Sequence, residues 1–76
     1  MTRSIRQRLA NARNRLNQTL QHILNINQLR KQLPYLDNPS LTQKELKEEL
    51  RVLNKIAAMQ ALLIRHYESM LVAESY

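Results

Sequence analysis

Apolar residues recur at alternating steps of four and three along two long runs of this chain, and one short segment separates the runs. This spacing gathers the apolar residues on one side of a helix, the pattern of a helix packed lengthwise on another helix. Pro34 and Pro39 are the only prolines, both lie in the separating segment, and the chain has no glycine. Because proline interrupts a helix and glycine weakens one, the distribution predicts two long helices joined by a turn.

The first run predicts a helix over about 3–33. We use the word seam for the side of each helix that faces the other helix. The helix is expected to end near Leu33, because Pro34 disfavours helical geometry in the residue before it. Thr19 and Arg30 are the polar interruptions of an otherwise apolar seam. The predicted seam residues are Ile5, Leu9, Ala12, Leu16, Thr19, Ile23, Ile26, Arg30 and Leu33.

The second run predicts a helix over about 41–74, after a turn at 34–40. Asn38 or Ser40 is suited to cap its start. A short turn between helices of similar length returns the chain antiparallel. We therefore predict an all-α, coiled-coil-like antiparallel hairpin that forms one domain, 1–76. The second seam reads Leu46, Leu50, Leu53, Ala57, Gln60, Ile64, Tyr67 and Leu71.

A hairpin of this size needs further burial to be stable. Chains of about 60 to 80 residues bury only about 60% of their unfolded surface, which leaves them marginal. The chain has 76 residues and no cysteine, so neither a disulfide nor a zinc thiolate can add stability. We expect another chain to complete the hairpin, either a different protein or a second copy of the same chain.

The second helix carries more apolar surface than one interface can bury. A second stripe lies beside its seam, rotated by about 100° because each stripe residue precedes a seam position. An exposed patch of this kind marks a binding site or an oligomer interface. The alternative is that both stripes are the core of a small bundle, which needs further helices from another chain. The predicted partner-binding residues are Val52, Ile56, Met59, Leu63, Tyr67 and Met70.

Positive charge is concentrated in the first helix. The chain has a net charge of +6, and residues 1–31 hold seven basic residues and no acidic one. A basic helix of this kind can bind nucleic acid or an anionic surface. The alternative is a solvated face that pairs with Glu68 and Glu74. Nucleic acid is the less favoured partner, because the sequence has no helix-turn-helix spacing and no zinc module. The candidate anion-binding residues are Arg6, Arg8, Arg13 and Arg15.

Nothing in the sequence indicates catalysis. His22 and His66 lie on different predicted helices without acidic or cysteine neighbours at metal-ligand spacing, and a chain without glycine has no phosphate-binding loop. We therefore expect no enzyme activity, no cofactor and no metal. The longest strongly apolar stretch, 56–64, is too short to cross a bilayer, and no apolar run of secretory length follows the basic start. We expect a cytoplasmic protein.

Three segments carry a resemblance to a known family. They are residues 66–74, His-Tyr-Glu-Ser-Met-Leu-Val-Ala-Glu; residues 30–33, Arg-Lys-Gln-Leu; and the apolar residues 62–64 that lead to Tyr67. With these segments the chain resembles the small co-chaperones of type III secretion needle subunits. The resemblance implies a bacterial cytoplasmic hairpin that pairs with a larger helical-repeat chaperone. It also implies that the pair keeps a needle subunit monomeric until export, and that the stripe of the second helix docks on the partner.

Overall fold

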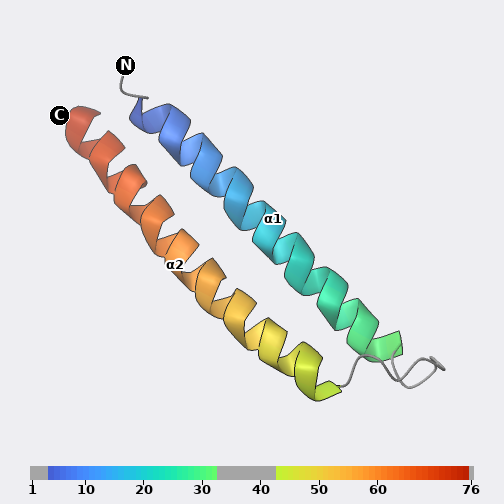
Figure 1. Ribbon diagram of the computed structural model, residues 1–76. Coiled ribbons are helices and arrows are strands. Elements are labelled where there is room, and N and C mark those ends of the chain that lie inside the picture. Colours follow the sequence, from blue (N-terminus) through green and yellow to red (C-terminus); the bar gives the residue numbers. More distant parts are fainter. Residues whose placement is uncertain (1–3, 33–42, 76) are drawn as a thin grey trace.

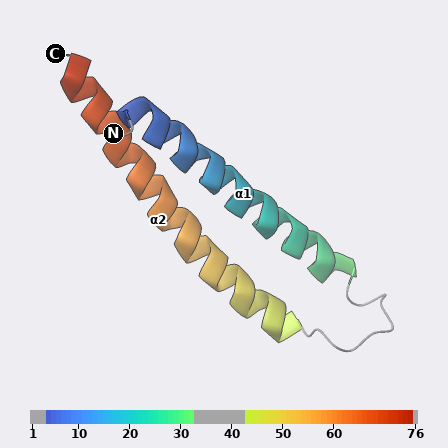
Figure 2. The same cartoon turned by 45° about the horizontal axis from the view of Figure 1, so that its top comes forward.

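A computed structural model describes residues 4–32 and 43–75, which form the helices α1, Ile5–Gln32, and α2, Gln43–Ser75. The helices lie side by side and antiparallel, with the start of α1 and the end of α2 at the same end of the molecule (Figure 1). A second view shows the same pairing (Figure 2). The predicted all-α hairpin is therefore confirmed. The predicted turn at 34–40, its capping residues and Leu33 lie outside the described residues.

Ser4 caps the start of α1. The backbone N–H of Gln7 donates to Ser4 Oγ at 3.2 Å, and the backbone N–H of Arg8 donates to the Ser4 carbonyl at 3.0 Å. The first N–H groups of a helix have no partner inside the helix, and a serine hydroxyl at this position satisfies one of them. The local sequence therefore sets where α1 begins.

The two seams form the core, and every predicted seam residue in the described ranges is buried or half-buried. The core divides into two clusters. The terminal-end cluster consists of Leu9, Ala12 and Ile64, packed with Leu16, Tyr67 and Leu71. The turn-end cluster consists of Ile26, Leu46 and Leu50, packed with Ile23, Leu29 and Leu53.

The polar seam residues behave in three different ways. Thr19 Oγ1 donates to the Arg15 carbonyl of its own helix at 3.1 Å. Arg30 Nε donates to Gln43 Oε1 at 3.2 Å, and Gln43 Nε2 donates back to the Arg30 carbonyl at 3.0 Å. This reciprocal pair ties the end of α1 to the start of α2. Gln60 Oε1 is buried and has no hydrogen-bond partner within the described part of the chain.

The hairpin is long and thin, so little of it is shielded from water. It measures 58 × 19 × 18 Å and exposes 6339 Å². A compact monomer of this mass exposes about 4,900 Å². The surplus of exposed surface arises because two helices that lie side by side have one line of contact. Within the described residues, no further layer covers their other sides. Most of the surface of each helix outside the seam is therefore open to a partner.

Candidate partner-binding face

Two ion pairs between the helices define the two sides of the hairpin. His22 Nε2 lies 3.5 Å from Glu49 Oε1, and both residues directly precede seam residues. Arg13 Nη2 lies 3.5 Å from Glu68 Oε1, and both directly follow seam residues. Because successive helical residues are rotated by about 100°, these two pairs lie on opposite sides of the seam. We call the side with His22 and Glu49 the stripe face and the other side the opposite face.

The second apolar stripe of α2 lies on the stripe face and is exposed. Val52, Ile56, Met59 and Leu63 each precede a seam residue, and their exposed fractions range from 40% to 69%. They lie at steps of four, three and four, so they form a continuous line along one side of the helix. The predicted surplus of apolar surface on the second helix is therefore present as an exposed row about three turns long.

The remaining predicted partner-binding residues are less exposed than that row. Met70 is half-buried. Tyr67 is also half-buried and packs on the terminal-end cluster, so it belongs to the seam as well as to the edge of the stripe face. His66 occupies the position between Leu63 and Met70 that the apolar pattern leaves open, and its ring centroid lies 5.9 Å from that of Tyr67.

A hollow of about 250 Å³ lies between the helices in the terminal half of the hairpin. One wall comes from α1, through Arg8, Asn11 and Arg15, and the other comes from α2, through Leu63 and Tyr67. Gln60, with its unpartnered buried Oε1, lines the same hollow, as does Ala12. The hollow is thus lined by the cations Arg8 and Arg15, by the unpartnered Gln60 Oε1, and by Leu63, the last residue of the exposed row.

The four candidate anion-binding arginines do not form one patch. Arg8 and Arg15 precede seam residues and line the hollow on the stripe face. Arg6 and Arg13 follow seam residues and belong to the opposite face, where Arg13 pairs with Glu68. Two residues along a helix correspond to a rotation of about 200°, so a flat polyanion cannot contact all four at once.

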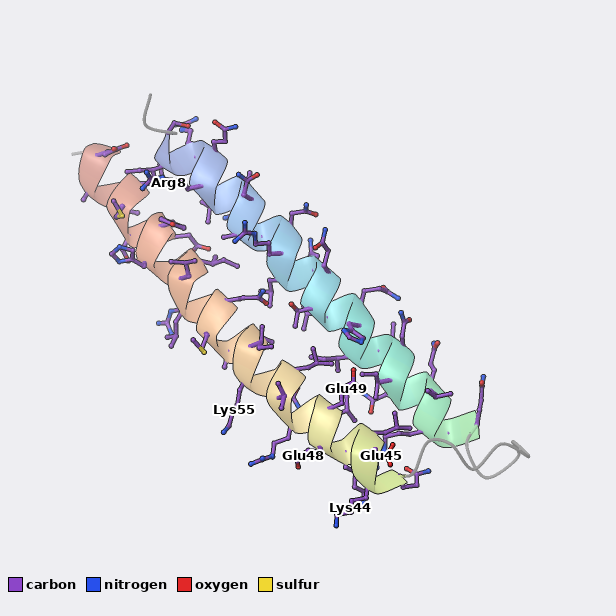
Figure 3. All side chains as sticks on the ribbon, viewed as in Figure 1. Arg8, Lys44, Glu45, Glu48, Glu49 and Lys55 are labelled. Atoms are coloured by element: carbon purple, nitrogen blue, oxygen red, sulfur yellow. The ribbon has the colours of Figure 1, made fainter. Side chains whose placement is uncertain are left out.

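Some charged side chains near the turn make ion pairs, whereas two arginines in the terminal half make none within the described residues. Within the described residues, Arg8 and Arg15 make no ion pair, and Figure 3 shows Arg8 extending toward the end of α2. Near the turn, Glu49 faces α1, while Glu48 points away from it beside Arg51 (Figure 3). The pKa of the Glu48 carboxyl is lowered because Arg51 donates a hydrogen bond to it and adds its positive charge.

The sequence prediction missed an apolar surface on α1. Leu20 and Leu24 are about half exposed, and each follows a seam residue, so they lie on the opposite face. Their spacing of four residues, one position after the seam, is the signal that would have found them. Leu62 and Val72 on α2 are exposed as well. Exposed apolar surface is therefore not confined to the predicted stripe.

The described residues contain no group of three acidic, histidine or cysteine side chains that could hold a metal ion. Neither α1 nor α2 is long and apolar enough to cross a membrane.

No family model matches the chain, and comparisons with curated proteins and with solved structures give no match either.

Proposed function

We propose that this chain is a non-catalytic protein-binding hairpin that docks a helix of another protein on its stripe face. The observation that carries the proposal is the exposed row Val52, Ile56, Met59 and Leu63. The hairpin exposes about 1,400 Å² more than a compact monomer of its mass. A standard interface buries about 800 Å² on each partner, so one interface of standard size would cover about half of that surplus.

The more specific form of the proposal is a co-chaperone of a type III secretion needle subunit. The resemblance of residues 66–74, 30–33 and 62–64 supports it, and an antiparallel hairpin is the fold that this resemblance implies. In this role the stripe face would pair with a larger helical-repeat chaperone in the bacterial cytoplasm. The pair would then hold a needle subunit monomeric, because a polymerising subunit needs its own apolar surface covered until export.

Co-expression tests this role. The full chain is produced together with a type III secretion needle subunit and a helical-repeat chaperone of its own organism, and the soluble fraction is separated by size. We expect one complex that contains all three proteins, with the needle subunit monomeric. Leu63→Ser should break the complex, whereas Leu24→Ser, a similarly exposed leucine on the opposite face, should leave it intact. A needle subunit that stays soluble and monomeric without this chain would contradict the role.

Self-association is the second candidate, and the straightness of the exposed row favours it. A row of aliphatic residues can pack on itself around a two-fold axis near Ile56 and Met59, since an isologous interface uses the same patch twice. Light scattering of the purified chain at low and high salt separates the candidates. A folded, salt-insensitive dimer or tetramer that Met59→Glu dissociates would favour the self-associated bundle over a hetero-partner.

A further inference from the structure

The stripe face has one apolar wall and one polar wall. Along α2 the wall is formed by the exposed row that ends with Met59 and Leu63. Along α1 the facing positions are Arg8, Asn11 and Arg15, all exposed. We call the space between these two walls the groove. An occupant of the groove must be apolar on one side and polar on the other, which is the surface of an amphipathic helix.

Within the described residues, the polar wall carries positive charge that no ion pair neutralises. Glu68 lies on the opposite face and pairs with Arg13, and Glu74, the other acid in the terminal half of α2, makes no ion pair with Arg8 or Arg15. The acids that lie on the stripe face belong to the turn half, where Glu49 faces His22. Arg8 and Arg15 thus give the terminal half of the stripe face a net positive charge that a partner can complement.

We propose that the stripe face binds an acidic amphipathic helix of a partner protein, which places its apolar residues on Met59 and Leu63 and two carboxylates against Arg8 and Arg15. This inference rests on the proposed protein-binding function and names the chemistry of the partner. Leu63 belongs to both the exposed row and the hollow, so the apolar and the charged contacts are continuous. One helix can make both.

The spacing of the arginines specifies the spacing of the carboxylates. Arg8 and Arg15 are seven residues apart, which corresponds to about 10.5 Å along α1. A helix lying along the groove would match them with acidic residues at positions i and i+7, because two helices packed lengthwise have the same rise. A hydroxyl or amide N–H between those acids can donate to Gln60 Oε1, whose burial without a donor is otherwise unfavourable.

The experiment uses the full chain and three synthetic helical peptides that share one apolar stripe. They differ only at two positions, i and i+7, which carry Glu in the first peptide, Gln in the second and Lys in the third. Affinity is measured by fluorescence anisotropy at low and high salt. The test variant is Arg8→Gln with Arg15→Gln, and the matched control is Arg6→Gln with Arg13→Gln, which removes the same charge from the opposite face. Circular dichroism records the helicity of each variant.

We expect the Glu peptide to bind about tenfold more tightly than the Gln peptide at low salt, because complementary charges at the rim of an interface add affinity that salt screens. The test variant should abolish this difference, and the control variant should keep it. Replacing both Arg8 and Arg15 with Glu should create a preference for the Lys peptide, a reversal that damage to the fold cannot produce.

Three outcomes would overturn the inference. Equal binding of the Glu and Gln peptides would contradict an acidic partner. If Leu63→Ser abolished that binding, the proposed protein-binding function would still be supported. Binding of none of the three peptides would count against the proposed function itself. A duplex DNA fragment that displaces the Glu peptide and loses affinity equally in the test and control variants would assign the arginines to phosphates.

Discussion

The turn half and the terminal half of the hairpin hold their helices together in different ways. In the turn half, the cluster of Ile26, Leu46 and Leu50 fills the seam with large aliphatic side chains, and Leu46 is only 2% exposed. The reciprocal hydrogen bonds of Arg30 and Gln43 close its end. The buried side chains of this cluster and the polar pair at its end are therefore satisfied within the described residues.

The terminal half is less complete. Its cluster includes the small side chain of Ala12, and the hollow beside it contains the unpartnered Oε1 of Gln60. The ion pair that spans the helices there, Arg13 with Glu68, is about half exposed on both sides and contributes about 0 to 1 kcal/mol. On its stripe face the terminal half thus offers a hollow, two arginines that make no ion pair within the described residues, and the exposed Leu63. A partner could therefore bind here by donating a hydrogen bond to Gln60 Oε1, by pairing with the two arginines, and by covering the exposed leucine.

The largest expected difference between the halves is in core packing. Leu46→Ala removes a nearly fully buried side chain, and such changes cost about 2 to 5 kcal/mol. Leu9→Ala in the terminal half should cost less, because Leu9 packs beside the small Ala12, which itself lines the hollow. Urea unfolding followed by circular dichroism measures both. Leu62→Ala, at an exposed position, is the control and should change stability by about 0.5 kcal/mol or less. A larger loss for Leu9→Ala would contradict the comparison.

Gln60 should be a residue that lowers the stability of the terminal half. Gln60→Leu removes a buried acceptor that lacks a donor, and this should stabilise the hairpin by about 1 to 2 kcal/mol, since leaving such a group unsatisfied costs about 1 to 3 kcal/mol. Thermal unfolding measures the gain. The control is Gln18→Leu, an exposed position of α1, which should have little effect. A loss of stability in Gln60→Leu would mean that the amide has a stabilising role in the free hairpin.

The hydrogen bonds at the turn end should contribute a smaller but measurable amount. Arg30→Ala removes one of these bonds and should cost about 1 kcal/mol, whereas Gln43→Ala removes both and should cost about 1 to 2 kcal/mol. Because the two residues act as a pair, the double variant should cost less than the sum of the single variants. Chemical unfolding of all three variants completes this double-mutant cycle. Lys31→Ala, at the neighbouring position, is the control and should have little effect. Additive losses would show that the two side chains are not coupled.

The smallest expected effect is the pH dependence of the surface pair Glu48 and Arg51. The pKa of Glu48 is lowered in the folded chain, so its contribution is present above the unfolded value of about 4.5 and is lost as pH falls below it. The melting temperature of Glu48→Gln should lie slightly below that of the parent chain at pH 6. The difference should shrink as pH falls below the unfolded value and through the lower folded one, because Glu48 is then protonated in both states. A difference that does not shrink at acid pH would assign the effect to something other than this charge.

Several features of the site follow from residue spacing alone. The seam residues of both helices are buried or half-buried as predicted, because alternating steps of four and three keep residues on one side of a helix. The exposure of Val52 and Met59 follows from the same count, one residue before the seam. The spacing also shows that the four arginines lie on two different faces, Arg6 and Arg13 on one and Arg8 and Arg15 on the other. The sequence prediction nevertheless grouped the four together.

Other features needed both helices in place. The hollow requires Arg15 and Leu63 to face each other from different helices, and this depends on the register between them. The exchange of hydrogen bonds between Arg30 and Gln43 depends on the same register. The exposed Leu20 and Leu24 did not need the second helix, because their position one residue after the seam was already contained in the sequence, and the prediction missed it.

The sequence by itself determined that this protein is two helices with one long seam, because helical periodicity and the confinement of proline are local properties of the chain. It also determined that α2 carries more apolar surface than one seam can bury. Only the tertiary structure decided which cations share a face with that surface and which polar groups stay unpaired. Such pairings depend on the register between residues far apart in the chain, and periodicity within one helix does not specify a register between two.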